Sequence, residues 1–479
     1  MSAVTVPSLA APRPPRRWGA GVRGALAVAA LCALAGAATG FAPLVAAGLA
    51  VGAVAIGVFA LFPAAVVLAI IVVRPGMETV AGSFTVGGTN LLGMLAVGTI
   101  VAGSVTLALH RPRLPPTPAI PLAAGFLLLG LVSLSWSFDP GDGFTQWTQL
   151  AFPVAVFVLT AALVRDVRGF HRVLAAVLAS AAIPLAVGLG QLATGDRIVK
   201  EGFSSIQGTF VHPNGFGLFL AVVLVAGIVA WMDLRPGSTA RVLVGALLAL
   251  GLVCLMQTFA RSAWGAFALG LALVALLVHR RLILLTAIVV VLTALAFPSV
   301  VEQVTGRFAD LSGASKAIQR NSLDWRTELW DRMLPYAYDR PVAGNGLGTF
   351  LPLTDREIGM FDFDFQTATS RATHIQVYPH NDYVYVGVEL GALGLLLWTG
   401  TLAALGLSAW HARRIAGLRP YAVAVAGIFA GLLVASAFDN VKTYQAVLLA
   451  AFALAGALAG AAFGEAQRRP GTPAIRCQT

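Results

Sequence analysis

A single histidine stands where a long hydrophilic stretch of the chain runs back into an apolar segment. His380 lies in the sequence Tyr378-Pro379-His380-Asn381-Asp382. Imidazole titrates near neutral pH, so a neutral histidine at this position is able to take a proton from a hydroxyl group as a general base. Asp382 and Asp439 are the candidate carboxylates to orient it. The alternative is a histidine that only hydrogen-bonds to loop backbone.

Two arginines have the chemistry to accompany such a base. Arg261 lies in a short polar turn, Thr258-Phe259-Ala260-Arg261-Ser262, and Arg326 lies in a hydrophilic segment predicted to be helical. A guanidinium donates two parallel hydrogen bonds to a phosphate and keeps its charge, so a lipid diphosphate is the expected partner of Arg261. Arginines near the base would also stabilise the negative charge that grows on a departing diphosphate. The alternatives are a salt bridge to a loop carboxylate for Arg261 and a solvated helix face for Arg326.

Three further polar or aromatic residues are predicted to contact substrate, namely His212, Trp330 and Asp439. His212 precedes Pro213 and Asn214, so it is also a candidate helix cap. Trp330 lies four positions after Arg326, on the same side of the predicted helix, where it either stacks on a sugar or packs in a core. Asp439 lies near Lys442, between the last two apolar segments.

The composition indicates that these residues belong to a membrane protein. The chain has 479 residues, of which 58% are hydrophobic and 11% are charged. Its mean hydropathy is +0.83. Lipid offers the backbone no hydrogen bonds, so the long continuous apolar runs predict helices. The three cysteines form no disulfide or zinc pattern. The net charge of +11 comes from basic residues scattered over short loops, which argues against nucleic acid.

We therefore expect an all-α polytopic protein with roughly 12–14 transmembrane helices and one large, partly helical outer loop. The predicted spans lie near 22–40, 43–61, 63–74, 90–110, 119–136, 147–164, 172–194, 213–232, 241–259, 262–278, 282–297, 383–409, 421–438 and 443–463. The expected regions are a cytoplasmic N-terminal tail (1–23), N-terminal transmembrane helices (24–297), the outer loop subdomain (298–379), C-terminal transmembrane helices (380–463) and a cytoplasmic tail (464–479).

The distribution of basic residues sets the expected orientation. Basic residues are concentrated in alternate short loops, so these loops are assigned to the cytoplasm together with both termini. The segment 298–379 then faces the periplasm or exterior, and its eight Lys and Arg against ten Asp and Glu leave it without a positive excess. A helix is predicted from Leu323, capped by Asn321-Ser322 and ended by Pro335. The polar residues named above then share the outer side of the membrane.

The order of these motifs resembles the O-antigen ligase and polymerase family of bacterial membrane glycosyltransferases. The resemblance covers about half the chain and rests on His212-Pro213-Asn214, Thr258 to Ser262, Arg326-x-x-x-Trp330, Pro341, Gly344, Gly346, Gly348, Phe350, His380-Asn381 and Glu389-x-Gly391-x-x-Gly394. It implies a fold of the GT-C type, a polyprenyl-diphosphate-linked glycan as donor and a hydroxyl as acceptor. It also implies that Arg261 and Arg326 contact the diphosphate and that His380 is the base.

The leading hypothesis is therefore an inverting glycosyltransferase that needs no metal and no cofactor. Members of the resembling family act on a growing glycan, a lipid A core or an exported protein, and the sequence leaves these acceptors open. Two other classes of protein stay under consideration. One is a transporter or flippase for lipid-linked glycans, and the other is a non-catalytic scaffold for polysaccharide assembly proteins.

Overall fold

The computed structural model describes residues 43–81, 85–86, 89–200, 203–284, 305, 322–358, 378–415 and 417–468. The helices are α2 (Pro43–Leu61), α3 (Pro63–Val73), η1 (Arg74–Gly76), α4 (Glu78–Ala81), α5 (Leu91–His110), α6 (Ala119–Ser133), η2 (Leu134–Trp136), α7 (Pro140–Leu163), α8 (Val167–Ala179), α9 (Ala182–Thr194), α10 (Pro213–Asp233), α11 (Thr239–Gln257), α12 (Arg261–Leu277), α15 (Ser322–Asp339), α16 (Phe350–Ile358), α18 (Asp382–Ala412), α19 (Arg419–Ala435), η4 (Val441–Thr443) and α20 (Gln445–Arg468). Strands in these ranges form two short antiparallel pairs, β1 (Thr85–Val86) with β2 (Thr89–Asn90) and β3 (Ile198–Lys200) with β4 (Phe203–Ser205). The all-α prediction is confirmed.

Eight helical segments in this part of the chain are long and apolar enough to cross a membrane, or nine if the pair interrupted at Phe62 counts as one span. They are α5, α6 with η2, α7, α8 with α9, α10, α11, α18 and α20. Two shorter apolar helices, α12 and α19, match further predicted spans. The chain is thus a multi-pass membrane protein. The predicted spans 22–40 and nearly all of 282–297 lie outside the described residues, as does much of the predicted outer loop.

Two helices extend beyond their predicted bounds, one because a polar residue caps it and the other because its last turn packs on a buried cluster. We predicted a span from residue 147, whereas α7 begins at Pro140, where the Asp139 carboxylate caps the helix by accepting from the Asp142 amide at 2.9 Å. The prediction that Pro335 ends the outer helix is wrong, since α15 continues to Asp339. Proline removes only one hydrogen bond from a helix, and Tyr336 and Ala337 beyond it pack against a buried cluster.

The chain divides into two compact units. The first comprises residues 1–63 and 101–111, and in it the His110 side chain lies 3.3 Å from the Ala60 carbonyl oxygen. The second comprises residues 64–100 and 112–479 and contains every candidate site residue. The site therefore belongs to one unit.

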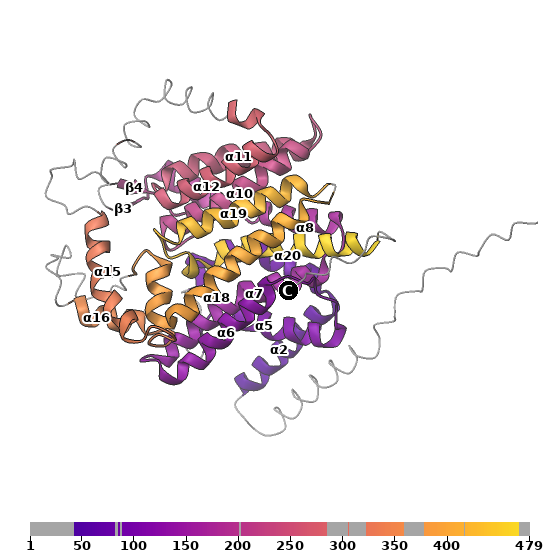
Figure 1. The fold of residues 1–479 in the computed structure, drawn as a ribbon. Coiled ribbons are helices and arrows are strands. Elements are labelled where there is room, and N and C mark those ends of the chain that lie inside the picture. Colours follow the sequence, from indigo (N-terminus) through magenta and orange to yellow (C-terminus); the bar gives the residue numbers. More distant parts are fainter. Residues whose placement is uncertain are drawn as a thin grey trace, which may run out of the picture. The chain divides into compact units, whose positions relative to one another are not determined.

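Helix α20 forms the centre of the second unit, where it packs against α7 and α8, and α19 packs against α12 and α18 (Figure 1). Small residues make this possible. A methyl group added at Gly456 or Gly460 would collide with the carbonyl of Phe157 or Ala161 on α7. Helices within a membrane gain no hydrophobic driving force from packing together, so they associate through close van der Waals contact of this kind.

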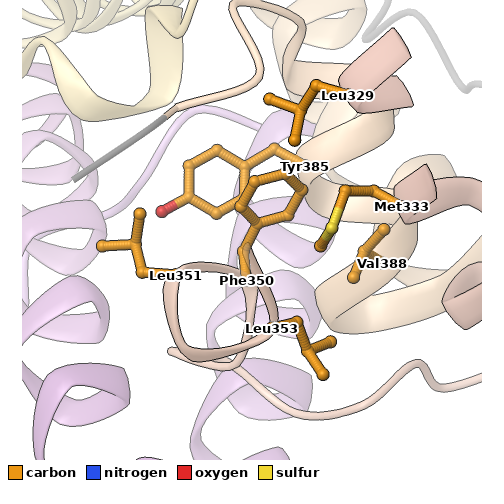
Figure 2. Close-up of a cluster of buried hydrophobic side chains, with 7 residues drawn as sticks. All are labelled: Leu329, Met333, Phe350, Leu351, Leu353, Tyr385 and Val388. Atoms are coloured by element: carbon orange, nitrogen blue, oxygen red, sulfur yellow. The ribbon is translucent and has the colours of Figure 1, made fainter. Parts of the chain in front are cut away.

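Helices α15 and α16 pack on the first turns of α18 through an apolar cluster. Figure 2 shows the Phe350 ring beside the Tyr385 ring, with the Met333 side chain of α15 next to them. The ring centroids of Phe350 and Tyr385 are 4.6 Å apart, and all three side chains are buried. This cluster fixes the part of α15 that carries Arg326 and Trp330 against the start of α18.

Candidate functional site

The backbone places His380 in a conformation that is rare for a residue with a side chain. Its φ is +48°, in the left-handed region, and the residue is 7% exposed. Hydrogen bonds hold the residues on both sides of His380. The Trp330 indole N–H donates to the Pro379 carbonyl at 2.7 Å. The Asn381 side chain caps α18 by accepting from the Tyr383 amide at 2.9 Å. Strained backbone persists only where its surroundings hold it, and such positions cluster at functional sites.

Asp439 is the buried carboxylate that faces His380. It lies in the loop between α19 and α20 with no exposed surface, and its Oδ1 is 3.4 Å from His380 Nδ1. The carboxylate also accepts from the Ser262 hydroxyl at 2.6 Å, the Tyr444 hydroxyl at 2.8 Å and the Asn440 amide at 2.9 Å. Its oxygens are thus satisfied from three directions by other parts of the chain.

Electrostatics favour the ionised form of this carboxylate. Burial by itself would raise the pKa of Asp439, but the contacts from His380 and Ser262 and the nearby His212 outweigh it and hold the pKa well below its usual range. An ionised carboxylate only accepts, so it favours the proton of His380 on Nδ1 and the lone pair on Nε2. Asn440 Nδ2 lies 3.5 Å from the same Nδ1 atom. Because both nitrogens carry hydrogen in this tautomer, this contact is not a hydrogen bond.

Both predicted arginines lead to the same loop. Arg261 is the first residue of α12, and its neighbour Ser262 makes the bond to Asp439. Two positions earlier, Phe259 has a φ of +50°. Arg326 reaches the loop from α15, where its Nη1 donates to the Phe438 carbonyl at 3.3 Å. Both arginines are half-buried.

His212 combines a structural contact with proximity to the candidate base. Its Nδ1 accepts from the Asn214 amide at 3.1 Å and so caps α10, as the structural alternative anticipated. Its ring centroid also lies 5.8 Å from that of His380. The structure thus brings His212, Trp330, Asp439 and His380 together. Arg261 lies next to Ser262, which binds Asp439, and Arg326 binds the carbonyl of Phe438.

A second buried carboxylate, Glu389, lies two turns further along α18. It accepts from the Lys442 ammonium at 2.7 Å and from the Gly348 amide at 3.0 Å. Helix α18 breaks just after it, at Gly391, whose φ is +63°. The Pro341 carbonyl accepts from the freed Ala392 amide at 2.8 Å. The glycine run after Pro341 therefore donates hydrogen bonds to backbone carbonyls of α18 near the break. The backbone that approaches these glycines closely belongs to the chain itself.

A family model described as O-antigen ligase matches residues 244–399. This match supports an assignment to the O-antigen ligase and polymerase family. The matched region contains Arg261, Arg326, His380 and Glu389, whereas His212 and Asp439 lie outside it. No curated protein matches the chain. The assignment supports a membrane glycosyltransferase of the O-antigen ligase type.

Several residues of this candidate site were not predicted from the sequence. Ser262, Asn440 and Tyr444 bind the Asp439 carboxylate. Ser262 belongs to the motif Thr258 to Ser262, but the motif did not indicate this contact, and no motif contains the other two residues. Asp382, considered beforehand as a partner of His380, instead accepts from the Ser436 hydroxyl and the Lys442 amide. The only available signal was that Asp439 and Lys442 fall in a short polar gap between two apolar helices, where charge is expensive unless it is paired.

Proposed function

We propose that this chain is an inverting glycosyltransferase that moves a glycan from a polyprenyl diphosphate to an acceptor hydroxyl at the outer face of the bacterial cytoplasmic membrane. The observation that carries the proposal is the convergence on one loop, 436–444. Asp439 in this loop faces His380, and Ser262 and Arg326 bind the same loop from α12 and α15. The family assignment supports the same chemistry.

The proposed roles follow from the contacts. His380 takes the acceptor hydroxyl proton on Nε2, while Asp439 holds Nδ1–H and stabilises the imidazolium that forms. The acceptor oxygen attacks the anomeric carbon as the bond from that carbon to the diphosphate oxygen breaks. The diphosphate leaves with its electron pair, and Arg261 and Arg326 bind its growing negative charge. We assign Asp439 to orientation of the base because its carboxylate is fully buried.

The positive-inside pattern of the short loops supports the orientation. It places both termini in the cytoplasm and His380 on the outer side, next to donor lipids and acceptors. No step of the proposed reaction needs a metal or a cofactor. Trp330 holds Pro379 through its indole N–H, and its half-buried ring supplies the remaining aromatic surface for a sugar.

Reconstitution with defined substrates tests the function. The purified chain is placed in liposomes with a polyprenyl-diphosphate oligosaccharide and, in separate reactions, with a glycan, lipid A core or peptide acceptor. We expect a new glycosidic bond with one acceptor class and a loss of at least about 100-fold in turnover for His380→Ala. His411→Ala, at the far end of α18, is the matched control and should retain turnover. Normal turnover by His380→Ala would rule out the proposed base.

The arginines are tested by charge and by shape. Arg261→Ala should lower turnover more than Arg261→Lys, since lysine keeps the charge but loses the two-pronged geometry. Arg332→Ala is the control for Arg326→Ala, because Arg332 lies on the same helix and pairs with Glu328 at 3.4 Å. Transport of the donor without a new glycosidic bond would point to a flippase. A requirement for a second protein would point to a scaffold.

A further inference from the structure

The contact between His380 and Asp439 joins two segments that are 59 residues apart in sequence. His380 precedes α18, and Asp439 lies in the loop Ser436–Tyr444 that connects α19 to α20. A separation of 3.4 Å between Nδ1 and Oδ1 is at the long end of hydrogen bonding, so a small displacement of either segment would break it. Some other contact must therefore hold the two segments in register.

Asp382 makes that contact. It is the first residue of α18, two positions after His380, and has no exposed surface. Its amide donates to the Ser436 carbonyl at 2.7 Å, and its Oδ2 accepts from the Ser436 hydroxyl at 3.0 Å. Its two carboxylate oxygens accept from the Lys442 amide at 3.2 and 3.0 Å.

These bonds hold the Asp439 loop at both ends. Ser436 lies three residues before Asp439 and Lys442 three residues after it. One side chain on the His380 segment thus fixes both approaches to the opposing carboxylate. We propose that Asp382 is a positioning residue that sets the geometry of the His380–Asp439 pair, and this proposal rests on the function proposed above.

The Lys442 side chain makes the positioning rigid. Its ammonium leaves the loop, donates to Glu389 at 2.7 Å and to the Gln146 side-chain oxygen at 3.3 Å, and lies 3.3 Å from the centre of the Tyr385 ring. Lys442 is therefore attached to α18 and α7 by its side chain and to Asp382 by its backbone. The loop has little freedom to slide along α18, because such a slide would break all of these contacts together.

A positioning role predicts a particular kinetic pattern. Loss of about 1 Å of alignment at a catalytic pair costs up to about 100-fold in rate. We expect Asp382→Asn to lower kcat by about 10- to 100-fold and to leave the KM for donor within about twofold, since Arg261 and Arg326 are untouched. Ser436→Ala removes only the hydroxyl donor and should lower kcat by less.

A double-mutant cycle separates positioning from general damage. If Asp382 acts through Asp439, then adding Asp382→Asn to an Asp439→Asn variant should lower kcat by less than about twofold further. Tyr421→Phe is the control, because it removes one interhelical bond, to Asp233 at 2.8 Å, at the opposite end of α19. The kcat of Tyr421→Phe should be close to that of the wild type. Its coupling energy with Asp439→Asn should be close to zero.

Each outcome decides between the two proposals. Independent, multiplicative losses in the Asp382 and Asp439 variants, or a kcat unchanged by Asp382→Asn in a folded protein, would overturn the positioning role and leave the base proposal standing. Retained turnover in His380→Ala would overturn the base instead. Monodisperse elution and a thermal midpoint near that of Tyr421→Phe identify variants that are folded, and Ser436→Ala provides the smaller change if Asp382→Asn is not.

Discussion

Two buried carboxylates in this protein, Glu389 and Asp439, are stabilised in different ways. Glu389 faces the Lys442 ammonium at 2.7 Å and accepts from the Gly348 backbone amide. Within the described part of the chain, the hydrogen-bond partners of Asp439 include no lysine or arginine; they are two hydroxyls, one backbone amide and the imidazole of His380. Both residues have no exposed surface, so burial does not distinguish them.

The difference lies in whether the partner is able to give up its charge. Lysine beside a carboxylate keeps its proton and makes a permanent pair, which suits an architectural role at the break in α18. Histidine gains and loses a proton near neutral pH, and the hydroxyls around Asp439 stabilise its charge in both states of the imidazole. The Glu389 side therefore holds the fold, and we infer that the Asp439 side serves the chemistry.

The largest expected effect breaks the permanent pair. Lys442→Ala leaves Glu389 buried without its cation, which should destabilise the protein by about 3–5 kcal/mol. Thermal unfolding in detergent, followed by size-exclusion fluorescence, measures the loss. A Lys442→Met and Glu389→Leu double variant removes both charges and should recover much of the stability. A double variant no more stable than Lys442→Ala would mean that the ion pair itself, and not the unpaired charge, is what matters.

The sequence predicted the fold class well because continuous apolar runs dictate helices. It misjudged ends, as at Pro140 and Pro335, because helices extend as far as caps and packing allow and hydropathy does not record either. The site divides in the same way. Sequence reasoning singled out His380 and Arg261 because each is a polar residue at the edge of an apolar run.

The sequence named Asp439 as a candidate partner of His380, but it did not predict the residues that bind Asp439. Ser262 and Asp439 are 177 residues apart in sequence and meet only in the folded bundle. The left-handed backbone of His380 likewise depends on Trp330 and Asn381 acting from two sides. A single sequence carries composition and periodicity, but not which hydroxyl or amide will stand opposite a buried carboxylate.

An intermediate loss of stability is expected when the hydrogen bonds to the Asp439 carboxylate are removed one at a time. Tyr444→Phe removes a hydroxyl that donates to Asp439 at 2.8 Å, and Ser262→Ala removes one that donates at 2.6 Å. A hydrogen bond to a charged group contributes about 1.5–3 kcal/mol, so each variant should lose about that much stability. Thermal unfolding provides the measurement. Thr399→Val, which removes a hydroxyl bonded within α18, is the control. Losses as large as that of Lys442→Ala would erase the distinction between the two carboxylates.

The smallest expected effect is a pH dependence that belongs to Asp439. Burial opposes its charge, yet His380, Ser262 and His212 together hold its pKa below the ordinary value of 3.8. A folded pKa below the unfolded one means that the unfolded chain binds the proton more readily. The resulting stability is present above the ordinary value and is lost as pH falls through the folded pKa.

The comparison of wild type with Asp439→Asn isolates this contribution, because all other carboxylates are common to both. Wild type should be the more stable at pH about 7, and its advantage should shrink as the pH is lowered below about 4. Thermal midpoints across that range give the difference curve. The curve should also respond to His380→Ala, since the imidazole is one of the groups that depress the pKa. A constant advantage at every pH would mean that folding does not change the pKa of Asp439. An advantage that grew as the pH fell would mean that Asp439 is protonated in the fold, and the imidazole would then lack the ionised partner that its role as base requires.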